Sequence, residues 1–276
     1  MNILFCGDSH AEDGVLITTL SLLKHVKEIH IYVLTMVTAN DNKQFYPFSS
    51  QAINLIEKII QRKNPKNTIK LFDITDLYEA QAPKVNQNTR FTPYAMLRLF
   101  ADQIPEIPDR ILYLDDDIII RKNIDSFYNQ NLHDTELVGI LDYYGRWFFH
   151  NRLRPFDYIN SGVLLLNMKE IKKTNLFARV RKLMQTKKMF LPDQTAINKL
   201  AKKKKYAPRK YNEQRKLHSN TVIQHFTTSF RFFPIIHTLT VKPWQVDKIH
   251  SILKIHDYDD ILNEYLKLQP LLKKKD

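Results

Sequence analysis

Three consecutive aspartates, Asp115 to Asp117, interrupt an otherwise apolar, β-branched run over residues 111–120. Such a run is typical of a strand buried on both faces. Carboxylates are costly to bury there unless they lie at the strand end and share a cation. Because side chains alternate along an extended chain, Asp115 and Asp117 should point the same way and Asp116 elsewhere. The cluster is a candidate Mn²⁺ or Mg²⁺ site, since these ions prefer oxygen ligands; the alternative is a solvated turn between two strands.

Strand-like and helix-like segments alternate along the first half of the chain. The expected strands are 2–7, 30–35, 68–72 and 111–120, and the expected helices are 15–25, 49–61 and 92–103. This order predicts an α/β fold with a Rossmann-like, mainly parallel central sheet flanked by helices. Ligands of such sheets bind beyond the carboxyl ends of the strands. Asp8 and the aspartate cluster follow two different strands and should therefore meet in one crevice.

The second half is less regular. Residues 137–141 and 161–166 are expected to be buried strands, separated by an aromatic and basic loop over 143–150 that either covers a ligand or packs on the core. Apolar positions at helical spacing over 246–268 predict one or two amphipathic helices, and Pro270 with its basic tail should end the fold. The predicted organisation is a catalytic domain over 1–245 and a helical, basic C-terminal extension over 246–276.

The net charge of +13 is concentrated near the C-terminus. Residues 201–276 hold 16 Lys or Arg against 7 Asp or Glu, including the runs 202–205 and 273–275. Such a surface could contact anionic lipid, nucleic acid or a polyanionic glycopolymer. The alternative is a solvated basic face that aids solubility.

Cysteine usage and hydropathy indicate a cytoplasmic protein. Cys6 is the single cysteine, the N-terminus lacks a basic region typical of a signal peptide, and no apolar run reaches the roughly 18 residues of a membrane span. Peripheral contact of the basic C-terminal part with the inner membrane face is a further hypothesis.

Glycine-rich phosphate loops are missing from the sequence. The five glycines lie too far apart to form a dinucleotide fingerprint or a P-loop. A bound diphosphate would need a metal ion and cationic side chains instead.

Other polar residues stand in apolar surroundings. Asn160 and Gly162 open a predicted strand, where the glycine would allow close backbone approach and the amide could bind a sugar. Asp193 precedes a helix-like run and could be a helix N-cap. Arg98 lies in an apolar helix, where a charge normally has a partner.

Six segments together resemble the retaining glycosyltransferases of family 8, and they occur in the family's order over roughly residues 2–244. These segments are 3–8, 94–99, 113–117, 160–165, 193–194 and 242–244. The resemblance implies a GT-A fold, a nucleotide-sugar donor that is usually UDP-linked, a divalent cation that is usually Mn²⁺, and retention of the α-anomeric configuration.

The resemblance also implies roles for individual residues. Metal ligands would be Asp115, Asp117 and a histidine. Nucleotide contacts would be Cys6, Asp8, His10 and the backbone of Asp116, with Arg98 facing the donor and Lys242 binding the diphosphate. Sugar contacts would be Asn160, Gly162, Asp193 and Gln194, with Gln194 near the anomeric carbon.

The histidine ligand is ambiguous because the family's glycine before Lys-Pro-Trp is missing. His225 ends a predicted strand and precedes an aromatic residue, but it lies 17 residues before Lys242 and implies an insertion. His237 lies five residues before Lys242, one short of the family spacing. His225 is the preferred ligand.

The predicted function is transfer of glucose or galactose from a UDP-sugar to a glycan, lipid-linked or protein-linked acceptor. Gln194 is a poor nucleophile, which favours attack by the acceptor on the leaving-group face. Three alternatives stay open: a metal-dependent nucleotidyltransferase, a polyanion-binding protein and an inactive family member acting as a scaffold. Nucleic acid is the less expected partner.

Overall fold

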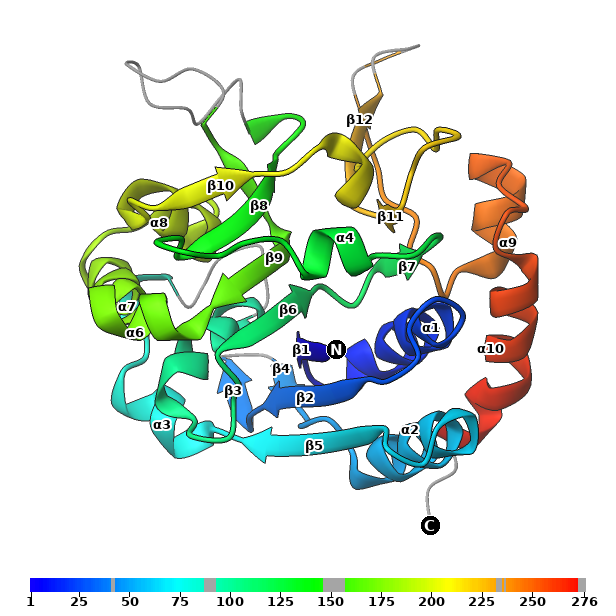
Figure 1. Cartoon of the computed structure of the whole chain (residues 1–276), viewed down its shortest axis with the longest axis horizontal. Coiled ribbons are helices and arrows are strands. Elements are labelled where there is room, and N and C mark those ends of the chain that lie inside the picture. Colours follow the sequence, from blue (N-terminus) through cyan, green and yellow to red (C-terminus); the bar gives the residue numbers. More distant parts are fainter. Residues whose placement is uncertain (41–42, 87–92, 146–156, 232–234, 236, 273–276) are drawn as a thin grey trace.

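The structure is a computed structural model that describes residues 1–40, 43–86, 93–145, 157–231, 235 and 237–272. A seven-stranded sheet runs through the described part in the order β10-β8-β9-β6-β1-β2-β5, and helices flank it (Figure 1). Strand β9 is antiparallel to both of its neighbours, and the other pairs in the sheet are parallel. The predicted α/β class with a mainly parallel sheet is confirmed.

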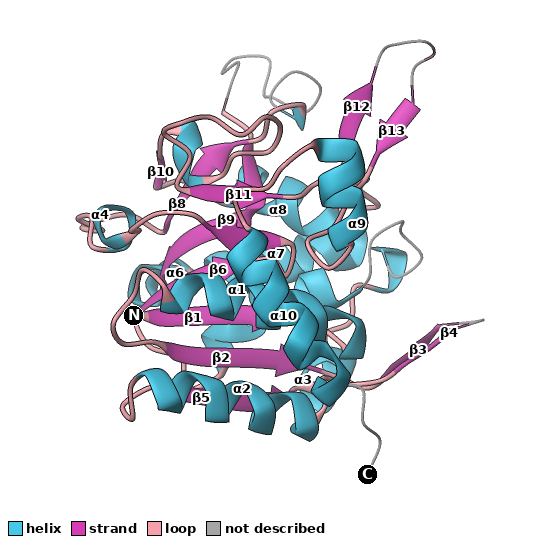
Figure 2. Cartoon of the chain, turned by 90° about the vertical axis from the view of Figure 1, so that its right-hand side faces the viewer, coloured by secondary structure: helices cyan, strands magenta, loops and turns pink. Residues whose placement is uncertain are grey.

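Most strands of the central sheet lie close to the predicted bounds. The exceptions are the strand expected over 111–120, which ends at Leu114, and a strand over Lys204–Tyr206 that was not predicted. The strands are β1 (Asn2–Cys6), β2 (His30–Thr35), β5 (Thr68–Asp73), β6 (Arg110–Leu114), β8 (Leu137–Leu141), β9 (Ile159–Asn167) and β10 (Lys204–Tyr206). Shorter strands form three further pairs: β3 (Thr38–Asn40) with β4 (Lys43–Phe45), β7 (Ile118–Ile120) with β11 (Ile223–His225), and β12 (Ser229–Arg231) with β13 (His237–Leu239). The hairpin β3–β4 projects from the body of the molecule (Figure 2).

Helical segments connect the strands. The α-helices are α1 (Glu12–Leu23), α2 (Ser50–Lys63), α3 (Thr75–Ala80), α4 (Asp125–Tyr128), α6 (Met168–Thr174), α7 (Leu176–Thr186), α8 (Pro192–Leu200), α9 (Val246–Lys248) and α10 (Asp259–Leu272). The 3-10 helices are η1 (Ser9–Ala11), η2 (Lys84–Asn86), η3 (Pro93–Gln103) and η4 (Arg209–Tyr211), and η5 (Ile249–Leu253) is a π-helix. The helix expected over 92–103 is thus a 3-10 helix, and that expected over 15–25 begins and ends earlier.

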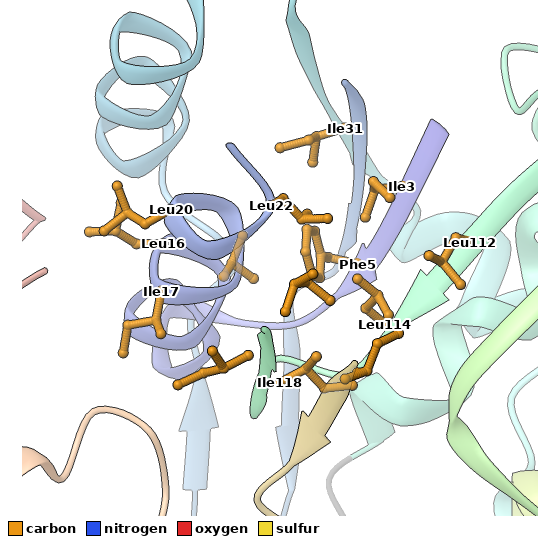
Figure 3. Close-up of a cluster of buried hydrophobic side chains, with 14 of the residues drawn as sticks. Ile3, Phe5, Leu16, Ile17, Leu20, Leu22, Ile31, Leu112, Leu114 and Ile118 are labelled. Atoms are coloured by element: carbon orange, nitrogen blue, oxygen red, sulfur yellow. The ribbon is translucent and has the colours of Figure 1, made fainter. Parts of the chain in front are cut away.

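Alternation along the strands divides the interior into two cores. On β1, Ile3 and Phe5 face one core while Leu4 faces the other, as the two-residue period of a strand requires. The first core lies under α1, α2 and α10, which pack side by side over that face of the sheet (Figure 2). Figure 3 shows Leu22 of α1 near Phe5 of β1, with Leu16 and Leu20 on the other side of the helix. The second core lies under η3, α6, α7 and α8.

The aspartate run does not continue one strand, contrary to the prediction. β6 ends at Leu114 and β7 begins at Ile118, with a turn at Asp116 and Asp117 between them. Because β7 leaves the central sheet to pair with β11, the chain must change direction here. The predicted extended alternation is therefore wrong, although the turn is not a solvated one, since Asp117 is only 4% exposed.

The two carboxylate-bearing strand ends lie side by side, as predicted. β1 and β6 are parallel neighbours, with Ile3 opposite Leu112 and Leu4 opposite Tyr113. Asp8 follows β1 by two residues and Asp115 follows β6 directly, so both lie at the carboxyl edge of the sheet.

The C-terminal segment packs into the first core. Ile249, Leu262 and Tyr265 are almost completely buried there, and the Tyr265 hydroxyl donates a hydrogen bond of 2.7 Å to Asp13 Oδ1 on α1. The prediction that Pro270 ends the fold is wrong by two residues, because α10 continues to Leu272. A domain boundary at residue 245 stays a prediction.

Of the two basic runs, 202–205 and 273–275, the structure describes the first. In the run 202–205, Lys203 Nζ lies 2.8 Å from Glu170 Oε1, and Lys205 Nζ donates to Asn131 O over 2.8 Å. Residues 273–275, and residues 146–150 of the aromatic loop, lie outside the described residues. Among the helices of the described part, none combines the length and the apolar character needed to cross a bilayer.

Candidate active site

A cavity of about 1300 Å³ opens at the carboxyl edge of the sheet. Twelve of the thirteen candidate residues named above line it: Cys6, Asp8, His10, Arg98, Asp115, Asp116, Asp117, Asn160, Asp193, Gln194, His225 and Lys242. Gly162 lies directly behind its wall, because a Cβ atom built on it would stand 2.6 Å from Asp115 Oδ2 and would also overlap His225. The sequence therefore located the residues of one cavity from seven separate segments.

Asp115, Asp117 and His225 form a compact candidate metal centre. The His225 Nε2 atom lies 3.0 Å from Asp117 Oδ1 and 3.7 Å from Asp115 Oδ2. These three ligand atoms lie within 4.8 Å of one another. Asp117 Oδ1 is buried and has no hydrogen-bond donor in the described part of the chain. His237, the alternative ligand, is exposed in β13 and lies outside this cluster.

The charges around Asp117 oppose the effect of its burial. Burial alone would raise the pKa of Asp117, but His225 and Lys242 lower it, and Lys242 Nζ contacts Asp117 Oδ2 directly. Burial and the nearby Asp117 raise the pKa of Asp116. Burial would lower the pKa of His225, but Asp117 raises it above its usual value.

A chain of hydrogen bonds fixes the orientation of the His225 ring. Both carboxylate oxygens of Asp142 accept hydrogen bonds, Oδ1 from the backbone N–H groups of residues 144 and 145, and Oδ2 from Asn160 Nδ2 over 2.9 Å. Asn160 Oδ1 then accepts from Asn212 Nδ2 over 2.9 Å. This leaves Asn212 Oδ1 to accept from His225 Nδ1, 3.0 Å away.

These hydrogen bonds also determine what the other ring nitrogen of His225, Nε2, presents to the carboxylates. With Nδ1 protonated, neutral His225 presents the lone pair of Nε2 to the two carboxylates. A lone pair facing Asp117 Oδ1 at 3.0 Å would be repulsive, so a proton or a cation must lie between them. Two carboxylate oxygens and one imidazole nitrogen fit a divalent ion such as Mn²⁺ or Mg²⁺.

Arg98 joins the metal centre to the next part of the cavity. Its guanidinium is 2% exposed, and Nη2 lies 3.5 Å from Asp115 Oδ1 and 3.3 Å from Asp193 Oδ2. The ring of Tyr113 lies 4.0 Å beneath it and its hydroxyl donates to Asp115 Oδ1 over 2.5 Å. The buried charge therefore has the acidic partners that its apolar helix required.

Asp193 is not the helix N-cap. Helix α8 has Leu191 at its N-cap position with no capping side chain, whereas the Asp193 carboxylate faces Arg98 and the hydroxyl of Ser161. Burial raises the pKa of Asp193, and Arg98 opposes this effect. The side chain therefore belongs to the cavity wall.

The amide side chains of Asn160 and Gln194 surround the Asp142 carboxylate in the cavity wall. Gln194 Nε2 donates to Asp142 Oδ2 over 3.1 Å, and Gln194 Oε1 accepts from the backbone N–H of Ser161 over 2.9 Å. Asn160 donates to the same Asp142 oxygen. Neutral donors and acceptors around one carboxylate are suited to binding hydroxyl groups.

Asp8 shapes the part of the cavity wall that follows β1. Its carboxylate caps the short helix η1, with Oδ1 accepting from the backbone N–H of His10 and Oδ2 lying 3.2 Å from His10 Nδ1. Burial raises the pKa of the Cys6 thiol, so this wall residue is an uncharged one. His10 itself points to solvent, with its side chain 77% exposed.

Sequence reasoning missed Asp142, Asn212 and Tyr113. Asp142 follows the strand β8 directly, which is the same signal that identified Asp115, so it could have been found. Asn212 lies in an irregular segment after η4 and carried no local signal. Its role follows only from contacts with residues distant in the sequence.

The fold and the site define an α/β enzyme whose active site lies at the carboxyl edge of a mainly parallel sheet, with paired carboxylates and a histidine at its centre. The model of glycosyl transferase family 8 matches residues 2–248. The chain therefore belongs to glycosyl transferase family 8 and is a glycosyltransferase.

Known proteins resemble the chain in sequence and in fold. Glycosyltransferase GlyA of Streptococcus pneumoniae is 28% identical over 170 residues, which are 59% of this chain but only 20% of that protein, so the chain spans about a fifth of the relative's length. The galactosyltransferase LgtC, solved with donor and acceptor sugar analogues, superposes with a TM-score of 0.65 at 17% identity and covers 100% of this chain and 98% of its own. The bifunctional glycosyltransferase WbbM superposes with a TM-score of 0.68 at 16% identity, covering 97% of this chain and 51% of its own. These likenesses confirm the predicted GT-A fold.

Proposed function

We propose that this glycosyltransferase uses a divalent metal ion to transfer a hexose, glucose or galactose, from a UDP-sugar to a glycan, glycolipid or glycoprotein acceptor, with retention of the anomeric configuration. One observation carries the proposal: Asp115, Asp117 and His225 meet beside Lys242 in the cavity at the sheet edge. The family membership and the donor analogue bound by LgtC support a nucleotide-sugar donor.

The metal centre and Lys242 would act on the leaving group. A cation held by the two aspartates and His225 would supply positive charge for the diphosphate of the donor. Lys242 Nζ is paired with Asp117 and lies at the cavity wall, where it would contact the same diphosphate. Positive charge fixed at the site where negative charge develops lowers the barrier to departure.

The other residues would hold the two ends of the donor. Cys6, Asp8, His10 and the backbone of Asp116 line the part of the cavity proposed for the uridine. Asn160, Asp193 and Gln194, together with Asp142, would bind the hydroxyls of the sugar. Arg98 would keep Asp115 and Asp193 in place between the two ends.

We propose attack on the leaving-group face. The acceptor oxygen forms a bond to the anomeric carbon while the bond from that carbon to the β-phosphate oxygen breaks, and the hydroxyl proton passes to the departing phosphate. Gln194 is a poor nucleophile, and its carbonyl oxygen already accepts hydrogen bonds from Ser161. The Asp193 carboxylate is held by Arg98, which supports a binding role over a covalent one.

We propose that the acceptor binds at the mouth of the cavity. Basic side chains of the C-terminal part would contact an anionic membrane from its cytoplasmic side. Because Lys203 and Lys205 have partners within the protein, neutralising 202–205 should weaken liposome binding less than neutralising 273–275. Sedimentation with anionic liposomes measures this, and equal binding by all variants would remove the membrane from the proposal.

The function is tested by a screen of UDP-glucose, UDP-galactose and UDP-GlcNAc with Mn²⁺, followed by proton NMR of the released or transferred sugar. The proposal expects UDP as the nucleotide product and an α-configured sugar at early times. Release of pyrophosphate would instead identify a nucleotidyltransferase. A β-configured product would overturn retention, and a stable glycosyl adduct on Asp193 would overturn the same-face route.

A further inference from the structure

We propose a second divalent-cation site, formed by His250, His256 and Asp259 where η5 leads into α10. The site lies outside the cavity and outside the family chemistry described above, and it does not depend on the proposed transfer reaction. Its expected ligand is a borderline transition-metal ion, with Zn²⁺ as the representative.

The three side chains already converge. His250 Nε2 lies 2.8 Å from Asp259 Oδ1, and His256 Nδ1 lies 3.2 Å from Asp259 Oδ2. The two imidazole rings stack with their centroids 4.6 Å apart and their planes 15° apart. All three ligand atoms lie within 4.8 Å of one another. Metal–ligand bonds of about 2.0–2.1 Å place neighbouring ligands roughly 3 Å apart, close to the two nitrogen–oxygen separations here.

The backbone between the histidines creates this convergence. The π-helix η5 ends at Leu253, and its C-cap Lys254 is a non-glycine residue in the left-handed region with a φ of 57°. This turn folds His256 back over His250, three residues before the first residue of α10. A costly backbone conformation is retained where it positions two imidazoles on one carboxylate.

The acidic residues next to Asp259 pair with other side chains, so Asp259 is the carboxylate that contacts the two histidines. Asp257 Oδ1 lies 2.8 Å from Arg121 Nη2, and Asp260 contacts Lys24. The charge on Asp259 is thus directed to the histidines. The three ligand side chains are 32%, 65% and 42% exposed, so an ion can enter from solvent.

Ligand chemistry separates this site from the one in the cavity. Two imidazoles and one carboxylate suit Zn²⁺, Ni²⁺ or Cu²⁺, whereas two carboxylates and one imidazole suit Mn²⁺ or Mg²⁺. Two stacked imidazoles also repel when both are protonated, and a single divalent ion would bind both lone pairs with the carboxylate. Occupation would join η5 to the first turn of α10, the helix that packs on α1.

The test is Zn²⁺ competition against a chromophoric chelator with the full-length protein in excess Mg²⁺. We expect His256→Ala and the isosteric Asp259→Asn to lose one zinc equivalent or at least about tenfold in affinity, since even replacement of an outer partner costs that much. His225→Ala and the exposed control His133→Ala should keep this equivalent. Matched unfolding curves without zinc verify that each variant is folded.

Cu²⁺ electron paramagnetic resonance gives an independent readout. The cavity site can offer one imidazole and the proposed site two, so hyperfine coupling to two nitrogens should persist in His225→Ala and fall to one in His256→Ala. Equal zinc stoichiometry and affinity in wild type and His256→Ala, or loss of the tight zinc only in His225→Ala, would overturn the proposal.

Discussion

At the scale of single residues, the orientation of one imidazole determines whether the candidate metal centre can work. The chain from Asp142 through Asn160 and Asn212 leaves His225 Nε2 as a lone pair facing Asp115 and Asp117. None of these amides is a metal ligand, so their effect should appear in metal affinity.

Replacing Asn212 tests this orientation. Asn212→Leu removes the acceptor for His225 Nδ1 at a position that is 1% exposed. Second partners of metal-bound histidines contribute about 10- to 100-fold to affinity, so Mn²⁺ binding should weaken by that factor. Titration of Mn²⁺ followed by electron paramagnetic resonance measures it. The same change at Asn263, exposed on α10, is the matched control and should leave binding unaltered.

The pH dependence of metal binding follows from the charge around His225. Burial would lower the pKa of this imidazole, but Asp117 raises it above its ordinary 6.5. The raised pKa means that a proton stays on Nε2 to a higher pH, and a metal must displace it. Mn²⁺ affinity should therefore rise with pH through and above 6.5. Calorimetric titrations over this range should also show proton release, and pH-independent binding without it would contradict the role of His225.

At the scale of elements, β9 brings the backbone close to the metal ligands. Leu114 at the end of β6 pairs with Val163 on β9, which places Gly162 against Asp115 and His225. Neither ligand is the free end of a long, flexible chain. Because Gly162 has no side chain, the pairing of β6 with β9 can bring its backbone against Asp115 and His225 without displacing them.

Gly162→Ala should damage the site more than the fold. Its Cβ would stand 2.6 Å from Asp115 Oδ2, so this carboxylate and His225 must move apart. We expect at least about a tenfold loss of Mn²⁺ affinity, comparable to loss of an outer partner, with a thermal unfolding midpoint close to that of wild type. Preserved affinity together with a lowered midpoint would mean that the glycine serves only packing.

Helix α10 tests whether the C-terminal segment stabilises the whole domain. Leu262 is 1% exposed in the first core, whereas Leu266 on the same helix is 44% exposed. Leu262→Ala should lower the free energy of unfolding by about 2–5 kcal/mol, the usual cost for a buried leucine, and Leu266→Ala by much less. Urea unfolding measures both. An unchanged main transition in Leu262→Ala would show that residues 246–276 form a detachable extension.

Sequence patterns predicted the elements better than the contacts between them. Alternation of strands and helices predicted the parallel sheet, and strand-end carboxylates located the cavity. The break of residues 111–120 into β6 and β7 was not predictable, because it depends on pairing of β7 with β11, about a hundred residues away. Asn212 was missed for the same reason, since its partners His225 and Asn160 come from separate elements.

At the scale of the whole molecule, the sheet, the two cores and the C-terminal helices position residues from seven segments around one cavity. Family membership makes the chain a glycosyltransferase. The metal, the UDP-linked donor and the retained configuration are what the arrangement of the site leads us to propose. The cluster of two aspartates and one histidine is the part of the site that carries the metal proposal.

The most direct test of that cluster is the rate of UDP release from the preferred UDP-sugar, measured with and without Mn²⁺ in wild type and Asp117→Asn. Loss of one carboxylate from the metal centre removes charge without changing the volume of the side chain. We predict Mn²⁺-dependent UDP release by wild type and a loss of at least about a hundredfold in Asp117→Asn, in line with removal of one electrostatic stabiliser from an active site. UDP release that is independent of the metal, or that persists at the wild-type rate in the variant, would contradict the account.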